Sequence, residues 1–149
     1  MNSKFLIFLC LFIMQGCDDD SSEKELQSTI NLIKTNKSTW LASGVDSYTF
    51  TYFSSMSDCP LANPFPPVEI TVVNGSILSI YVPEFDQFQD VEKTHHLTIS
   101  QMFENMLENA GDIKGVPSFD DNFGYPKSYN TDLSDAECDG NSVVISSFI

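Results

Sequence analysis

The sequence predicts an α+β fold in which an antiparallel sheet of about five to six strands carries two helices on one face. Three observations predict it. Two segments space their apolar residues as helices do, others alternate apolar and polar residues as half-buried strands do, and an Asn-Gly pair divides two β-rich runs. The expected order is one helix, three strands, a second helix and about three strands, in a single domain over residues 23–149.

The first predicted helix covers residues 23–43. Its apolar residues recur at helical spacing on one face, formed by Leu26, Ile30, Ile33, Trp40 and Leu41. Gly44 follows directly and is suited to end the helix. Because Lys37 interrupts the apolar face, we expect the first half of the helix to project as a stalk.

A strand is predicted over residues 45–54, where Tyr48, Phe50 and Tyr52 share one face. Residues 55–67 contain four prolines and predict no regular structure. Residues 68–82 predict a hairpin, because the pair at positions 74 and 75, Asn-Gly, is preferred in a type I′ turn. The expected register pairs Val72 with Ile77 and Ile70 with Ser79, with Val68, Ile70, Val72 and Ile77 on one face.

Residues 83–96 are acidic and predict irregular structure. A second helix follows Thr98, which can form a capping box with Gln101, and Gly111 is expected to end it. Its apolar face predicts a core contact and not a cofactor groove; the face consists of Ile99, Met102, Phe103, Met106, Leu107 and Ala110.

The last third predicts strands over residues 113–119, 127–131 and 142–149, with a turn over residues 122–126. In the final strand, alternation places Val143, Ile145 and Ser147 on one face and Val144, Ser146 and Phe148 on the other.

Residues 1–16 have the three parts of a secretion signal: Lys4, ten apolar residues over positions 5–14, and Gly16 before Cys17. Ten apolar residues are too few for a transmembrane helix, which needs about 20. Residues 14–17, Met-Gln-Gly-Cys, resemble the lipobox of bacterial lipoproteins, whose cysteine receives a diacylglycerol. The resemblance implies acyl chains on Cys17. The polar run that follows indicates a tether, so residues 17–22 are expected to form the lipidated Cys and an acidic tether. The alternative is an ordinary signal cleaved near Gly16, with Cys17 free or in a disulfide.

We therefore expect a protein anchored to a bacterial envelope membrane, inner or outer, and facing the periplasm or the exterior. The net charge of −14, from seven Lys, no Arg and 21 acidic residues, repels phosphate backbones and excludes nucleic acid as a partner. A solvated acidic surface is the favoured interpretation of this charge, and dedicated cation binding is the alternative.

Cys10 would leave with the signal and Cys17 would carry lipid, so Cys59 and Cys138 remain as a pair. An oxidising compartment favours a disulfide between them, which would stabilise the fold by about 4.5 kcal/mol in the chain-entropy model. Two free thiols, or a metal site that uses both, are the alternatives. No His lies near either Cys, which disfavours zinc.

Several motifs in order resemble an uncharacterised family of small bacterial envelope lipoproteins, known only as a domain of unknown function. The resemblance covers residues 38–149 and rests on Trp40, residues 46–52, Cys59-Pro60, residues 70–77, Thr98-Ile99, Phe103, Phe119-Asp120, Gly124-Tyr125-Pro126 and Asp132. Relatives tend to carry two nearby cysteines after the first strand, where this chain has only Cys59. The family implies a fold and a location but no activity.

Two acidic segments are weak candidates for a metal site. One combines Asp90 and Glu92 with His95 and His96, although adjacent histidines point apart. The other, Asp135, Glu137 and Asp139 before Gly140, echoes a calcium loop, but its twelfth position is Ser146 where a Glu is expected. In both segments the ordinary interpretation is a solvated acidic loop.

Tyr125 is held in a set direction by Pro126 and is expected to close the edge of the core or to contact a partner. We find no nucleophile elbow, no Cys activated by His and no phosphate-binding glycine loop, so we expect neither an enzyme nor a cofactor. The expected function is a lipid-anchored binding or assembly module that engages another envelope protein or a small ligand. A calcium- or zinc-binding lipoprotein and a minor envelope enzyme are the alternatives.

Overall fold

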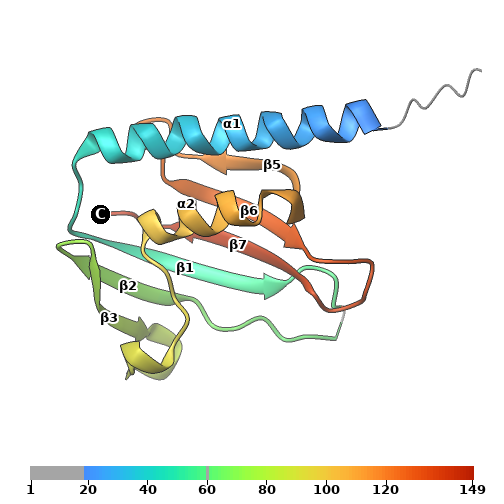
Figure 1. Ribbon diagram of the computed structural model, residues 1–149. Coiled ribbons are helices and arrows are strands. Elements are labelled where there is room, and N and C mark those ends of the chain that lie inside the picture. The colour runs from blue at the N-terminus through green and yellow to red at the C-terminus, as the bar shows by residue number, and fades with distance from the viewer. Residues whose placement is uncertain (1–18, 60) are drawn as a thin grey trace, which may run out of the picture.

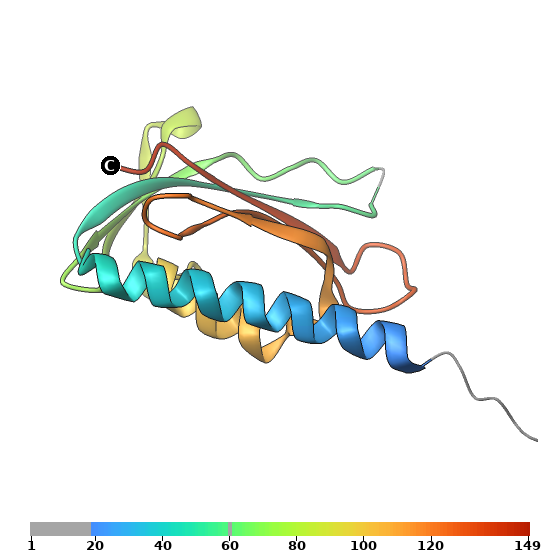
Figure 2. The ribbon, with the colours of Figure 1, turned by 90° about the horizontal axis from the view of Figure 1, so that it is seen from above.

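A seven-stranded antiparallel sheet carries both helices on the same face, as two views at right angles show (Figure 1, Figure 2). The computed structural model describes residues 19–59 and 61–149. The strand order is β4-β3-β2-β1-β7-β6-β5. The α+β class and the placement of the helices are confirmed, while the sheet has one strand more than expected.

The helices are α1 (Asp19–Ser43) and α2 (Ile99–Glu108). The strands are β1 (Tyr48–Met56), β2 (Val68–Val73), β3 (Ser76–Val82), β4 (Gln87–Gln89), β5 (Ile113–Phe119), β6 (Pro126–Asp132) and β7 (Gly140–Ser146). Three short 3-10 helices are η1 (Pro83–Phe85), η2 (Val91–Lys93) and η3 (Ala110–Asp112).

The sheet consists of two antiparallel meanders joined at its centre. β1 to β4 run outward to one edge, and β5 to β7 run inward from the other edge. The first strand pairs with the last along residues 51–56 and 141–146. The connection from β4 to β5 carries α2, so the chain passes from one edge of the sheet to the other through a helix that covers the shared face (Figure 1).

α1 packs through Ile33 and Trp40, which are buried, and Gly44 adopts the left-handed conformation expected after the helix. Leu41 was expected on the buried face but is 61% exposed, because it lies about 100° around the helix from Trp40, whose side chain faces the core. Lys37, which interrupts the apolar face, forms an ion pair with Glu104 of α2 at 2.7 Å. The stalk is shorter than expected, because Leu26 and Ile30 are partly buried.

The hairpin of β2 and β3 forms around the expected turn, with positive φ at both Asn74 and Gly75. Val72 pairs with Ile77 as predicted, but Ile70 pairs with Ile80 and not with Ser79. The predicted register was wrong from this point because a β-bulge leaves Leu78 without a partner. The bulge turns Ile80, which is fully buried, and Val82 toward the helices.

Residues 83–96 were expected to be irregular, and in part this was wrong. Between η1 and η2, the chain forms the three-residue edge strand β4, which pairs with β3. All three of its residues are exposed, so the segment lacks the apolar alternation that predicts a strand.

The capping box of α2 is confirmed: the Thr98 side chain accepts from the Gln101 backbone N–H, and the Gln101 side chain accepts from the Thr98 N–H. Four apolar side chains of the predicted face are buried in α2, namely Ile99, Met102, Phe103 and Met106. The helix ends at Glu108, before Gly111, because the chain tightens into η3. Ala110 of that turn is buried as well.

The C-terminus departs from simple alternation. Ser147 has a φ of +49°, which inserts a kink after β7. Phe148 was expected on the face opposite Ile145, but the kink turns it toward the core, where its ring stacks on Tyr48 at 5.3 Å and meets Trp40 edge-on at 5.8 Å. The prediction for Phe148 was therefore wrong, because one positive φ shifts the alternation by one residue.

Candidate functional site

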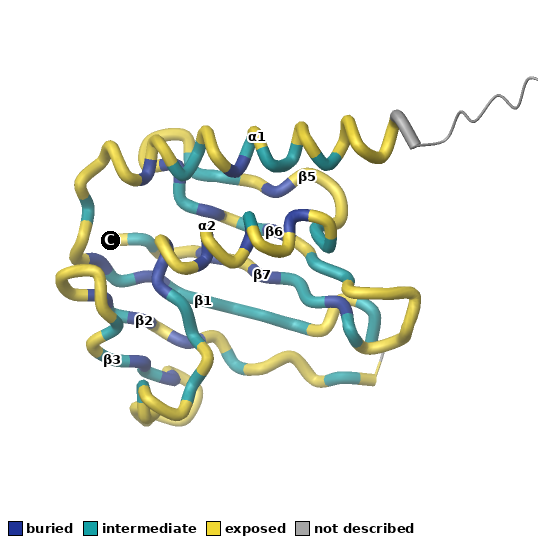
Figure 3. Tube along the Cα trace, viewed as in Figure 1, coloured by how far each residue is buried: buried dark blue, intermediate teal, exposed yellow. Residues whose placement is uncertain are grey.

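The face of the sheet beneath the helices has a packed end and an open end. In β1, Tyr48 and Phe50 are 6% and 0% exposed, whereas Met56 at the far end of the strand is 46% exposed. Figure 3 shows this change along β1, from buried to intermediate. We call the first region, around Tyr48 and Phe50, the packed end. The open end comprises Tyr52, Ser54 and Met56 of β1 with their neighbours Thr131 and Asn141.

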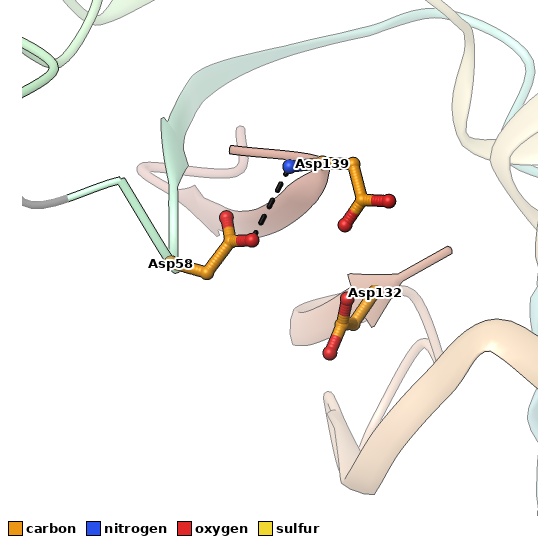
Figure 4. A group of neighbouring side chains, drawn as sticks. All are labelled: Asp58, Asp132 and Asp139. Atoms are coloured by element: carbon orange, nitrogen blue, oxygen red, sulfur yellow. Dashed lines mark hydrogen bonds between the residues drawn. The ribbon is translucent and has the colours of Figure 1, made fainter. Parts of the chain in front are cut away.

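Three carboxylates converge beside the open end. Asp58, Asp132 and Asp139 each offer one oxygen, and these oxygens all lie within 4.8 Å of one another (Figure 4). They come from three segments: the chain after β1, the end of β6 and the loop that leads into β7. Across the part of the chain that the structure describes, this is the one group of three or more potential metal ligands.

Local structure explains why these residues meet. A disulfide joins Cys59 to Cys138, with Cα atoms 4.5 Å apart, and thereby brings the neighbouring Asp58 and Asp139 together. The register of β6 and β7 pairs Asp132 with Gly140, which places Asp132 at the same edge. The disulfide that the sequence favoured is thus present, and the alternatives of two free thiols or a metal site built on both cysteines do not describe this structure.

Hydrogen bonds fix the Asp58 carboxylate. It accepts from the backbone N–H groups of Gly140 at 2.9 Å and Asp139 at 3.2 Å. Desolvation raises the pKa of Asp58, but the backbone hydrogen bonds, led by that of Gly140, outweigh it and hold the pKa below its usual value. Asp58 is therefore a carboxylate anion held in a fixed orientation.

Gly140 makes this close approach possible. A Cβ atom at position 140 would lie 2.6 Å from Ser57 Oγ and 3.0 Å from Asp58 Oδ1. Any side chain there would push the Asp58 carboxylate away from the backbone N–H groups that hold it. Only glycine, which has no Cβ, fits at position 140 beside Asp58.

The two other carboxylates carry oxygens without partners. Oδ1 of Asp132 and Oδ1 of Asp139 are both buried and, among the described residues, form no hydrogen bond. The second oxygen of Asp139 accepts from the Ser134 hydroxyl at 2.6 Å. Buried anionic oxygens without partners are costly, and coordination of a cation would remove that cost.

The structure does not assemble the first predicted metal site. Asp90 caps η2 by accepting from the Glu92 N–H, and it forms an ion pair with Lys93 at 3.0 Å. His95 is exposed, whereas His96 is half-buried with its ring edge-on to Tyr52. Among the described residues, Asp90, Glu92, His95 and His96 do not converge on one point, because each side chain has a different local environment.

One residue of the second candidate metal site lies in the carboxylate cluster. Asp139 belongs to the carboxylate cluster, but Asp135 and Glu137 are exposed and lie outside it. The calcium-loop pattern does not describe the cluster, because its carboxylates come from separate segments and Ser146, at the twelfth position, lies within β7. Asp58 and Asp132 were missed. The signal for Asp58 was its position next to Cys59, since a bridge to Cys138 would bring Asp58 and Asp139 together.

Tyr125 is partly buried and its ring stacks on Phe148 with centroids 4.5 Å apart. Burial and the nearby Asp120 raise the pKa of its hydroxyl. Between Asp120 and Tyr125, Gly124 lies against α1, because a Cβ there would be 2.6 Å from the Asn36 carbonyl oxygen. These contacts favour the core-closing role over a partner contact. Cys17 lies outside the described residues.

Together, the fold and the cluster define a single-sheet α+β domain with one helical layer and a carboxylate site at one end. The chain belongs to a family of unknown function, DUF6174, whose pattern matches residues 32–149. The match confirms the coarser part of the resemblance found in the sequence, namely a domain of unknown function over nearly the same residues. No curated protein and no solved structure matches the chain. Within the described residues, no helix is long and apolar enough to cross a membrane.

Proposed function

We propose that this chain is a lipid-anchored lipoprotein of the bacterial envelope whose exported domain binds Ca²⁺ through Asp58, Asp132 and Asp139. The observation that carries the cation site is that two of the three converging carboxylates, Asp132 and Asp139, each have a buried oxygen with no partner among the described residues. Three converging anionic oxygens are the ligands that hard cations prefer.

The geometry favours calcium over zinc and magnesium. The cluster offers carboxylate oxygens, and the nearest sulfur atoms, those of Cys59 and Cys138, are joined in the disulfide and cannot act as thiolates. A Ca²⁺–oxygen distance is about 2.3–2.6 Å, so oxygens on opposite sides of one ion lie about 5 Å apart. The oxygens of the cluster all lie within 4.8 Å of one another, so one ion can contact all three. Magnesium requires shorter bonds and usually keeps several of its waters.

The anchor and the location rest on the sequence. Acyl chains on Cys17 would bind the membrane durably, because each buried methylene contributes about 0.8 kcal/mol and a single chain is only marginal. An acidic domain exported by this route would meet extracellular or periplasmic cations, and its binding role requires no catalysis.

Thermal unfolding of the full chain in detergent, followed by the fluorescence of Trp40, tests the cation site. At a Ca²⁺ concentration about 100 times the Kd, binding adds about 2.7 kcal/mol and raises Tm by several degrees. Asp132→Asn should abolish the shift. Asp135→Asn removes the same charge from an exposed position in the neighbouring loop and should keep it. Equal shifts in both variants, or no shift in the natural chain beyond that of KCl at equal ionic strength, would exclude the site.

Mass spectrometry of the protein from its membrane fraction tests the anchor. We expect a chain that begins at Cys17 and carries acyl chains, and a Cys17→Ala variant that is released from the membrane. An unmodified start, or a retained leader, would contradict the anchor and leave the cation site unaffected.

A further inference from the structure

The open end of the sheet contains a cleft that is separate from the carboxylate cluster. Two hollows, of about 310 and 130 Å³, adjoin at Tyr52, His95 and His96. The outer hollow lies between the loop before β2, at Phe65 and Pro66, and the segment that leads into α2. The inner hollow continues between α2 and the strands β1, β6 and β7.

The walls of the cleft are polar but almost free of charge. Among the described residues that line the two hollows, none is Lys, Arg, Asp or Glu, although the chain carries 21 acidic residues. The polar side chains of the inner hollow are amides and hydroxyls, including Asn105, Thr131 and Asn141. Since a buried ligand charge requires an opposite charge or several hydrogen bonds, this lining suits an uncharged ligand.

Tyr129 provides a hydrogen-bond donor that the fold itself does not use. The residue is 8% exposed and lines the inner hollow, yet its hydroxyl forms no hydrogen bond with any described residue. Burial, with a smaller effect of Tyr52, raises its pKa, so the hydroxyl stays protonated. Unlike the buried oxygens of Asp132 and Asp139, this hydroxyl is not sealed from solvent, so it is open to the inner hollow, where water or a ligand group can bond to it.

Aromatic rings form the entrance. The rings of Tyr52 and His96 meet edge to face with centroids 5.3 Å apart, and Phe65 is 65% exposed at the outer hollow. Desolvation lowers the pKa of His96, so its imidazole is neutral and offers one donor and one acceptor. Flat apolar rings beside uncharged donors and acceptors match the two kinds of surface on a sugar, a C–H face and an edge of hydroxyls.

We propose that this cleft binds a neutral sugar or a short neutral glycan, with the C–H face of a ring against Tyr52 and Phe65 and its hydroxyls directed to Tyr129, Thr131 and Asn141. The outer hollow lies at the lower end of the range for small-ligand sites, about 300–1,000 Å³, and accommodates one or two sugar rings. The binding is independent of the cation at Asp58, Asp132 and Asp139.

Sugar binding can be measured through the NMR signals of the two histidines that line the cleft, His95 and His96. In the full chain, labelled with ¹³C-histidine and held in a detergent without a sugar head group, the imidazole signals report on the cleft, and His96→Gln assigns them. Maltose and the disaccharide of N-acetylglucosamine should shift the His96 signal saturably. Glucosamine and glucuronate, which carry a charge on a similar ring, should bind at least tenfold more weakly than the uncharged monosaccharides glucose and N-acetylglucosamine.

Two variants locate the binding. Tyr129→Phe should raise the Kd about fivefold through the loss of one hydrogen bond. Tyr81→Phe, on the opposite face of the sheet, should leave the Kd unchanged. Thermal unfolding checks that both variants fold, and Asn141→Ala replaces Tyr129→Phe if that variant does not. The proposal is overturned by equal binding of neutral and charged sugars, by no saturable shift up to tens of millimolar neutral sugar, or by an unchanged Kd when the cleft variant is folded.

Discussion

The packed end and the open end of the sheet both include residues of β1, but different interactions stabilise the two ends. At the packed end, Trp40 of α1 meets Tyr48 of β1 edge-on at 5.2 Å, and its indole N–H donates to Ser100 of α2 at 3.0 Å. At the open end, the corresponding positions carry Ser54 and Asn141, and a disulfide and backbone hydrogen bonds to Asp58 maintain the structure. The comparison indicates that the packing of the helices on the sheet, and not the pairing of its strands, determines where this sheet can bind a ligand.

The largest expected effect tests the packed end. Phe50 is fully buried, so Phe50→Ala should lower the free energy of unfolding by about 3–5 kcal/mol through lost transfer energy and a cavity. Ser54→Ala, four positions further along the same face of β1 toward the open end, should change it by about 0.5 kcal/mol or less. Denaturant unfolding measures both. Similar losses in the two variants would remove the distinction between the ends.

The next effect tests the covalent support of the open end. Removing the disulfide with Cys59→Ser and Cys138→Ser should cost about 2–5 kcal/mol, because the unfolded chain gains freedom over 79 positions. The calcium-dependent rise in Tm should also disappear, since Asp58 and Asp139 are no longer held together. A double variant with unchanged calcium response would show that strand register alone positions the carboxylates.

A smaller effect tests the boundary between the ends, where α2 begins. Thr98 is 3% exposed and caps the helix, and the adjacent Ile99 N–H donates to the Tyr48 hydroxyl at 3.0 Å. Thr98→Ala should lower the free energy of unfolding by about 1 kcal/mol. Thr98→Ser keeps the capping oxygen and should recover most of that loss. Urea unfolding curves of the two variants that coincide would argue against a capping role.

The smallest effect concerns His96 and pH. Because burial lowers the pKa of His96 in the folded state, the unfolded chain binds the proton more readily. Stability should therefore fall as pH drops below about 6.5, the ordinary pKa of histidine, and level off below the folded-state pKa. Replacing His96 with Gln should reduce this fall, whereas His95→Gln, at the exposed neighbour, should not. Measuring the Tm of both variants across this pH range tests this expectation.

Much of the fold could be predicted because the relevant signals are local. The capping box at Thr98, the type I′ turn at Asn74-Gly75 and the left-handed Gly44 depend on neighbouring residues and were confirmed. The register beyond Val72 and the position of Phe148 could not be predicted in this way. Both depend on a single irregular backbone position whose benefit, burying Ile80 or Phe148, appears only after the sheet and helices have assembled.

The candidate site was less predictable for a related reason. Its carboxylates lie far apart in the sequence, and only Asp139 belonged to a candidate metal pattern, although Asp132 was among the motifs of the family resemblance. The pairing of Cys59 and Cys138 was expected, and it could have indicated Asp58. Asp132 required the register of β6 on β7, which no motif specifies. Acidic residues are common in this chain, so their number alone could not distinguish converging carboxylates from solvated ones.

The direction in which α1 enters the domain has a consequence for the proposed anchor. Asp19, the first residue of α1, follows Cys17 by two positions, and a helix of 25 residues is a stiff rod of about 37 Å. Both ribbon views place the start of α1 and the loop before β7 at the same end of the molecule (Figure 1, Figure 2). If the chain is anchored at Cys17, Asp132 and Asp139 would thus face the lipid head groups. Calcium uptake would then change the charge that the domain presents to the bilayer and so the strength of its repulsion from anionic lipids.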